Sequence, residues 1–249
     1  MPMRKVLTAL LLFVSCSLLA QEQLDNMNFD QWSKVKGTWY PSAKNGKSVW
    51  GTSNPGTSIL RINSTVPEYE HVAVSGSGKA AAKIVSRKLV WAFLTGNLFT
   101  GEFVRVVKFS GAEMYNGVPF HSRPKSLSGY YHYRPGTIDF TDDDHESMKG
   151  KRDQGQIEIA LYGWKQRQHF ISNDGPSLPA TQDPALIGYA RLTLKEDSGG
   201  YVPFELKIDY RSDATPTYVY ISALSSRMGE FFTGSSGSVL YLDELQFNY

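Results

Sequence analysis

Hydrophobic and polar residues alternate with a period of two in several short segments of the chain. The clearest is the segment 204–210, in which an apolar or aromatic residue occupies every second position and a charged residue each position between. Successive side chains of a β-strand point to opposite faces, so this pattern predicts a strand with one buried face. Nine comparable segments, together with 204–210, predict about ten strands. They lie at residues 59–62, 72–74, 80–85, 103–109, 127–133, 157–164, 189–194, 218–223 and 239–247.

Turn-forming residues separate these segments. They occur as Asn-Pro-Gly at Asn54, Arg-Pro-Gly at Arg134, Asp-Gly-Pro at Asp174 and Gly-Gly at Gly199. No segment sustains the period near 3.6 that an amphipathic helix requires. Many short strands with turns between them predict an all-β protein with little helix, built as an antiparallel β-sandwich or jelly roll whose sheets bury their apolar faces against each other.

The N-terminal residues have the layout of a secretory signal. Two basic residues, Arg4 and Lys5, precede an apolar run that ends at Ala20 in a small-residue cleavage site. The run is shorter than the roughly 20 residues of a membrane-spanning helix, and no other apolar stretch reaches that length. We therefore expect a signal peptide at 1–20, a single domain at 21–249, and export to the periplasm, the outer surface or the medium.

Cys16 is the only cysteine of the chain. Cleavage after Ala20 leaves a mature domain without a thiol, which excludes disulfide bonds and cysteine-ligated metals. The alternative is a lipoprotein, in which Cys16 is acylated and becomes the first mature residue. Ordinary cleavage is preferred because Phe13 stands where a lipoprotein signal has an aliphatic residue.

The two basic residues of the signal also account for the whole formal net charge of +2, so the mature domain is formally neutral. Proteins that bind nucleic acid neutralise phosphates with an excess of Lys and Arg. We therefore expect no nucleic-acid partner.

Two predicted strands carry aromatic residues mixed with polar ones on a single face. In the segments 127–134 and 157–164, the apolar positions face a core and the intervening positions project to the other side. Sugar rings stack on aromatic side chains and hydrogen-bond to planar polar groups, so a glycan is the expected ligand if both strands line one surface; alternatively, the aromatics only fill a wide sandwich. The candidate ligand-binding residues are Tyr130, His132, Arg134, Glu158, Tyr162 and Trp164.

Aromatic residues also crowd the N-terminal part of the mature chain, at Trp32, Trp39, Tyr40 and Trp50. They form either a second stacking platform or a plug that closes one end of the sandwich. The plug is favoured, because Phe29 and Trp32 have the apolar spacing of a first strand.

Asp30 and Asp243 fall on the predicted first and last strands, which are neighbours in many jelly rolls. Oxygen ligands from both strands would hold a structural calcium ion, whereas the alternative is that each aspartate caps a turn. The sequence otherwise requires no cofactor. No glycine-rich phosphate-binding motif is present, and the distance between paired carboxylates that defines a glycosidase is not fixed by sequence.

Several ordered motifs together resemble one family. They lie at residues 28–32, 49–54, 98–103, 119–124, 126–136, 225–234 and 237–244. Between about Leu24 and Tyr249 the chain resembles the PCMD family, the putative carbohydrate metabolism domain of Bacteroidota. The resemblance implies a β jelly roll similar to carbohydrate-binding modules, in secreted or surface proteins tied to glycan use, without a settled reaction. His132 departs from the lysine expected in the tyrosine-rich motif.

These observations predict an exported, non-catalytic glycan-binding protein linked to polysaccharide use. The alternatives are a glycoside hydrolase or related carbohydrate-active enzyme on the same fold, and a structural or adhesive surface protein. Fold alone does not choose among them. Two carboxylates that face each other across an aromatic-lined cleft would favour the enzyme. A cleft with aromatic residues but without such a pair would favour the binding protein, and a flat apolar patch would favour the structural role.

Overall fold

The computed structural model describes residues 21–42, 48–74, 78–89, 92–107, 111–171 and 180–249. The predicted signal peptide and Cys16 therefore lie outside the described residues, as does the end of the predicted strand at 103–109. No helix in the described part of the chain is long and apolar enough to cross a membrane.

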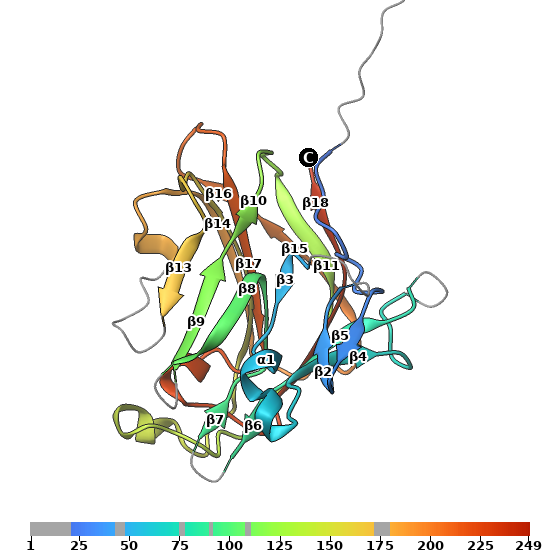
Figure 1. The fold of residues 1–249 in the computed structure, drawn as a ribbon, viewed down its shortest axis with the longest axis vertical. Helices are drawn as coiled ribbons and strands as arrows, with labels where there is room; N and C mark the ends of the chain where they lie inside the picture. The colour runs from blue at the N-terminus through green and yellow to red at the C-terminus, as the bar shows by residue number, and fades with distance from the viewer. Residues whose placement is uncertain (1–20, 43–47, 75–77, 90–91, 108–110, 172–179) are drawn as a thin grey trace, which may run out of the picture.

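Two antiparallel sheets make up the body of the protein (Figure 1). The larger has nine strands, which follow the order β13 (Gln168–Ile171), β9 (Gly111–Asn116), β8 (Asn97–Val107), β17 (Tyr218–Leu224), β12 (Gly155–Tyr162), β14 (Leu186–Leu194) and β16 (Asp209–Tyr210). Two short strands complete it, with β3 (Trp50–Gly51) beside β8 and β10 (Val118–Pro119) beside β17.

The smaller sheet has five strands, in the order β15 (Val202–Lys207), β11 (Ser126–Arg134), β18 (Val239–Asn248), β5 (Ala81–Val85) and β4 (Thr65–Glu68). Two hairpins flank the sheets, β1 (Ser33–Val35) with β2 (Thr38–Tyr40), and β6 (Arg87–Lys88) with β7 (Phe93–Leu94). Among the described residues, helix is limited to the one-turn α1 (Asn54–Thr57) and to 3₁₀ turns at Ser58–Leu60, Asp143–Met148, Ala180–Gln182 and Gly229–Phe231. The predicted all-β sandwich with little helix is confirmed.

The core lies between the two sheets. Leu127 and Leu240 of the smaller sheet pack in one buried cluster with Ile157 and Ile221 of the larger sheet. Alternation sets which side chains enter it, since β-strands expose every second residue to the same face. Each sheet therefore has an inner face toward the core and an outer face on the opposite side. The predicted ligand-binding residues lie on the outer faces.

The segment 204–210 shows both what alternation predicts and what it does not. Phe204, Leu206 and Ile208 are buried, as predicted, and the charged residues between them are exposed. The chain nevertheless changes sheet at Ile208, because β15 pairs with β11 in the smaller sheet whereas β16 pairs with β14 in the larger one. One predicted strand is therefore two strands that close one edge of the sandwich.

Two predicted strands are absent from the described structure. Residues 59–62 follow the helix α1, which has Pro55 in its first turn, where the fixed φ of proline is suitable, and Ile59 is 89% exposed. Residues 72–74 do not pair with a strand, because Ala73 N–H donates to the Asp243 carboxylate instead. Short apolar runs do not distinguish a strand from a turn, and both predictions were wrong for this reason.

The N-terminal segment lies beside the last strand (Figure 1). Leu245 N–H donates to the Met27 carbonyl at 2.9 Å, and the Gln23 side chain forms two hydrogen bonds of 2.9 Å with the backbone of Phe247. Phe29 is fully buried, and its ring meets that of Trp50 edge-on at 5.2 Å. Of the four aromatic residues of the predicted plug, Trp50 is in the core and Trp32 packs against it, whereas Trp39 and Tyr40 lie on β2 outside that cluster. Residues 28–32 are not a strand, and Phe29 has a φ of +52°.

Candidate functional site

The six predicted ligand-binding residues do not share one surface. Three belong to β11 in the smaller sheet, and the other three lie on β12 or directly after it, in the larger sheet. Because Leu127 and Ile157 both face the core between the sheets, the outward residues of the two strands point to opposite sides of the sandwich. The prediction of a common surface was therefore wrong, and the six residues form two separate groups.

The first group lies on the outer side of the smaller sheet. Tyr130 is half-buried and Arg134 is exposed. The His132 ring stacks on Tyr241 with centroids 5.2 Å apart, and its Nδ1 lies 2.9 Å from Nε2 of His71. Burial and the neighbouring His71 lower the pKa of His132. This histidine is thus tied into a ring cluster rather than directed at solvent.

The second group lies on the outer side of the larger sheet, where Glu158 occupies the centre of a cross-strand row. It stands opposite Arg191 of β14 and Ser222 of β17. Oε2 of Glu158 accepts hydrogen bonds from Arg191 Nε at 3.2 Å, Arg191 Nη2 at 3.1 Å and the Tyr189 hydroxyl at 3.1 Å. Its Oε1 accepts from Ser222 Oγ at 3.4 Å. The carboxylate is therefore fixed on both oxygens.

The next row along β12 is closely packed, and Ala160 at its centre is fully buried. Ala160 stands opposite Tyr189 on one side and Tyr220 on the other, so a methyl group separates two half-buried phenol rings. One row further, Tyr162 stands opposite Tyr218, which is also half-buried. We call this surface the tyrosine face and define it by Tyr189, Tyr218 and Tyr220 around Ala160, with the Glu158–Arg191 pair at one end.

Tyr162 and Trp164 support the other end of the tyrosine face. Their rings stack at 3.8 Å with planes 11° apart, and only 4% and 8% of their respective surfaces are exposed. Trp164 Nε1 donates to Asp183 Oδ2 at 2.9 Å, and Gly117 approaches so closely that a Cβ atom there would lie 2.8 Å from the indole. These two residues pack beneath neighbouring side chains instead of offering open rings.

Burial controls the protonation of the phenols on this side. It raises the pKa of Tyr189, and the adjacent Glu158 carboxylate raises it further. Burial is also the main reason that the pKa of Tyr220 is raised, with contributions from the Glu158 and Glu230 carboxylates. The hydroxyls of Tyr189 and Tyr220 therefore stay protonated and are able to donate hydrogen bonds.

Sequence reasoning missed the three half-buried tyrosines, together with Arg191 and Ser222. The signal was present in the predicted strand at 218–223, where Tyr218, Tyr220 and Ser222 alternate with the core residues Val219 and Ile221. Pairing of this strand with β12 brings the outward faces together, and pairing is a long-range property that alternation does not specify.

The proposed metal ligands lie near each other but are held by the chain. Asp30 Oδ1 accepts from the backbone N–H groups of Lys79 and Ala80, and Asp30 follows a turn rather than lying on a strand. The Asp243 oxygens accept from Ala73 N–H and Glu244 N–H, each at 2.9 Å. Burial raises the pKa of Asp243 to about 6, and the Glu244 and Asp30 carboxylates add to the shift.

Within the described ranges, no group of three or more His, Cys, Asp or Glu side chains is placed to hold a metal ion. The Asp30 and Asp243 carboxylates nevertheless interact electrostatically, and their oxygens have lone pairs left for a cation. A structural calcium ion at these two residues stays a prediction.

The comparisons with known proteins agree with the fold. The model of a family described as "Putative carbohydrate metabolism domain" matches residues 28–248. A putative glycoside hydrolase from Bacteroides thetaiotaomicron is 24% identical, with a TM-score of 0.66 over 89% of this chain and 70% of that one. Another putative glycoside hydrolase, from Bacteroides vulgatus, is 20% identical, with a TM-score of 0.68 over 89% of this chain and 96% of that one. No curated protein matches the chain.

Proposed function

The chain belongs to the putative carbohydrate metabolism domain family, and from this premise we propose that it is an exported, non-catalytic protein that binds a glycan on the tyrosine face. The observation that carries the proposal is the arrangement of Tyr189, Tyr218 and Tyr220 around Ala160 on three adjacent strands. Export rests on the predicted signal at residues 1–20.

The tyrosine face suits a sugar ring for two physical reasons. Tyr189 and Tyr220 flank the fully buried Ala160, and the exposed parts of their phenol rings offer apolar surface to sugar C–H groups and hydroxyls to sugar oxygens. The three strands that carry these residues lie inside the larger sheet, between β8 and β16, so the backbone beneath them is held on both sides. A rigid surface loses little conformational entropy on binding.

Glu158 favours a binding role over acid catalysis. Its carboxylate is paired with Arg191 and accepts hydrogen bonds from two hydroxyls, so both of its oxygens are already engaged as acceptors. A general acid must carry a proton for the leaving group. The Glu158–Arg191 pair is better suited to orient sugar hydroxyls, since Arg191 is partly exposed and keeps donors available.

A glycoside hydrolase is the second candidate, and one observation favours it. Glu230, in the turn Gly229–Phe231, contributes with Glu158 to the raised pKa of Tyr220, which brings a second carboxylate near the tyrosine face. Glycosidases use two carboxyl groups on either side of the scissile bond. Release of reducing ends by the mature protein, abolished in both Glu158→Gln and Glu230→Gln, would establish this candidate in place of the binder.

The proposal is tested first by a glycan array and then by titration calorimetry on the best ligand. Loss of aromatic stacking in nucleic-acid-binding proteins costs about 1 to 3 kcal/mol per ring, and a sugar contact at the lower end corresponds to about tenfold in affinity. We expect Tyr220→Ala to weaken binding by about this factor, whereas Tyr69→Ala, a change at an exposed tyrosine away from this face, should leave it unchanged.

Tyr130→Ala serves as the opposing test. It removes a half-buried tyrosine from the outer side of the smaller sheet. Weaker binding in Tyr130→Ala with unchanged binding in Tyr220→Ala would move the site to the smaller sheet and overturn the assignment to the tyrosine face.

A further inference from the structure

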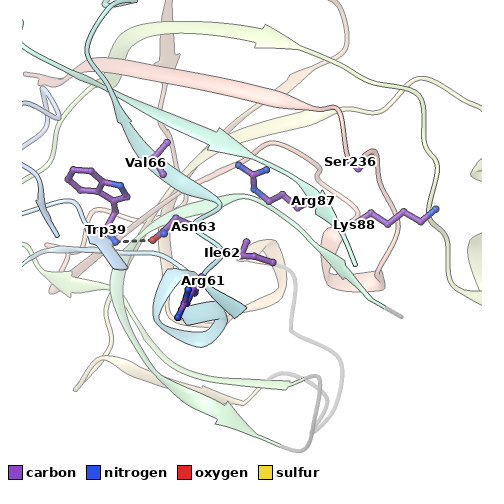
Figure 2. A pocket seen from close by; sticks show the side chains of 8 residues that line it. All are labelled: Trp39, Arg61, Ile62, Asn63, Val66, Arg87, Lys88 and Ser236. Carbon is purple, nitrogen blue, oxygen red and sulfur yellow. Dashed lines mark hydrogen bonds between the residues drawn. The ribbon is translucent and has the colours of Figure 1, made fainter. Parts of the chain in front are cut away.

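A concave region separate from the tyrosine face lies at the edge of the smaller sheet, next to the two hairpins (Figure 2). It has a volume of about 640 Å³ and is lined by side chains that include Trp39, Arg61, Asn63, Val66, Arg87 and Lys88. They come from β2, from the chain after the turn Ser58–Leu60, from β4 and from β6. We call it the basic pocket, because three of its lining residues are cations and none is an acid.

The pocket is held in shape by hydrogen bonds to the backbone. Asn63 Oδ1 accepts from Trp39 N–H at 2.9 Å, and Asn63 Nδ2 donates to the Gly37 carbonyl at 3.0 Å. Asn54 Nδ2 donates to the Trp39 carbonyl at 3.0 Å. The hairpin that carries Trp39 is thereby fixed against the chain that carries Arg61. The walls of the pocket are therefore preorganised.

Arg61 occupies a strained position. It ends the turn Ser58–Leu60 with φ of +56° and ψ of +30°, a left-handed conformation that residues with a Cβ rarely adopt. A glycine would adopt this conformation without strain. From this position the arginine lines the pocket.

The cations differ in how they are paired. Lys88 Nζ donates to the Asp139 carbonyl at 3.3 Å. In Figure 2 the Lys88 side chain extends away from Trp39 and Arg87. For Arg61 and Arg87, no guanidinium hydrogen bond or ion pair occurs with another described residue, and both residues are exposed. The Asp139 carboxylate also interacts electrostatically with Lys88 and accepts two hydrogen bonds from Ser236. Two unneutralised guanidinium groups therefore share the pocket.

Trp39 supplies a different kind of donor. The indole N–H groups of Trp32, Trp50 and Trp164 donate to Phe29, Asp25 and Asp183 respectively. Trp39 has no such partner in the part of the chain that the structure describes, and its side chain is half-buried. Lys34 lies over its ring at 5.0 Å, which adds positive charge beside the pocket. Trp39 thus places a free N–H and part of an aromatic surface next to the two arginines.

We propose that the basic pocket binds a sugar unit that carries an oxyanion, either the carboxylate of a uronic acid or a sulfate ester. The planar guanidinium of arginine pairs with such oxyanions through two parallel hydrogen bonds, and Arg61 and Arg87 are both available for this geometry. The indole of Trp39 contacts the sugar ring and donates to one of its oxygens. This inference rests on the proposed function, because it assigns an acidic glycan to a protein proposed to bind glycans.

The test compares three oligosaccharides of equal length by titration calorimetry, namely a neutral oligogalactan, an oligogalacturonate and a sulfated oligogalactan. We expect at least one anionic probe to bind more tightly than the neutral probe, and its affinity to fall as salt is raised from 0.05 to 0.5 M, concentrations that bring the screening length to about 14 Å and about 4 Å. Preference for the carboxylate or for the sulfate distinguishes the two sources of the oxyanion.

The matched variants are Arg61→Gln, Arg87→Gln and, as a control elsewhere on the molecule, Arg227→Gln. Loss of one charged hydrogen-bonding partner corresponds to about tenfold in affinity. We expect this loss for the anionic probe in Arg61→Gln and in Arg87→Gln, with unchanged melting temperature and unchanged binding of any neutral glycan. The control should bind the anionic probe as the wild type does.

The outcomes separate this inference from the proposed function. Equal affinity for the neutral and anionic probes, or unaltered anionic binding in Arg61→Gln and Arg87→Gln, overturns the basic pocket and leaves the tyrosine face standing. If Tyr220→Ala loses binding of the anionic probe and the arginine variants keep it, the basic pocket is likewise overturned and the tyrosine face stands. Absence of binding to every glycan on an array overturns both.

Discussion

Tyr162 and Trp164 stack face to face on the outer side of the larger sheet, with ring centroids 3.8 Å apart. The two residues are on the same side of the chain because they are two positions apart, and the register of β12 against β17 places Tyr218 beside them. Leu186 of β14 completes a small apolar cluster outside the main core. The stacked pair therefore belongs to the packing of the sheet, and it supports the tyrosines that remain open.

Replacement of Trp164 by alanine tests this packing role. Because the indole is 8% exposed and its N–H is bonded to Asp183, Trp164→Ala should lower the free energy of unfolding by about 3 to 5 kcal/mol. Trp39→Ala, at a half-buried tryptophan without such a bond, should cost about 1 kcal/mol or less. Urea unfolding at pH 7 measures both. Equal small losses would show that the Trp164 ring is not packed.

The Glu158–Arg191 pair gives a second prediction. Glu158→Gln leaves an amide NH₂ opposite groups that also donate, so unfolding free energy should fall by about 1 to 3 kcal/mol. Glu196→Gln removes a partner of Arg152 in an exposed ion pair and should cost about 0.5 kcal/mol or less. If the double variant Glu158→Gln/Arg191→Met is destabilised by the full sum of its single changes, the two side chains are not coupled.

How far the sequence predicts this structure depends on the range of the interaction involved. Alternation correctly placed Leu206 in the core and Glu158 on an outer face, because the side to which a residue points is a local property of a strand. It did not place Tyr130 and Tyr162 on different sheets, since strand order is decided by pairing between distant segments. Alternation also did not predict the change of sheet at Ile208, for the same reason.

The candidate sites also depend on strand pairing, which the local pattern does not predict. The aromatic residues of the tyrosine face are visible in the printed sequence, but only the register of β12 with β14 and β17 brings Tyr189, Ala160 and Tyr220 into one row. The basic pocket combines Trp39, Arg61 and Arg87 from three separate elements. Their spacing in the sequence has no period that would reveal a site, and the left-handed backbone of Arg61 carries no signal in a residue other than glycine.

Acid should weaken the protein through His132. Its pKa in the folded state is lowered from the usual value near 6.5 by burial and by His71, so the unfolded chain binds the proton more readily. Stability is therefore fully present above pH 6.5 and is lost as the pH falls below it. Unfolding free energies measured from pH 8 to pH 5 should show this loss in the wild type and in His121→Gln, and a smaller loss in His132→Gln. The same slope in all three proteins would exclude His132 as the cause.

The predicted signal peptide has a direct chemical test. Because the apolar run of the signal ends at Ala20, protein recovered from its native cell envelope should begin at or near Gln21. Mass spectrometry of the intact protein measures the N-terminus. An N-terminal Cys16 that carries acyl chains would instead make the protein a lipoprotein.

Calcium binding at Asp30 and Asp243 makes the last prediction. A fully buried Asp243 with its pKa raised to about 6, close enough to Asp30 and Glu244 for their charges to act on it, is stabilised by a cation that offsets the negative charge. The ion would bind the folded state alone, so saturating calcium should raise the melting temperature and chelator should lower it. Asp243→Asn removes one ligand and should abolish the response to calcium, whereas Asp209→Asn, at an exposed position of β16, should retain it. Calorimetric titration of calcium into chelator-treated protein provides a readout that does not depend on the stability of the variants. Identical melting curves with and without chelator, together with no heat of calcium binding, would leave both aspartates as acceptors for the backbone N–H groups of Ala73, Lys79 and Ala80.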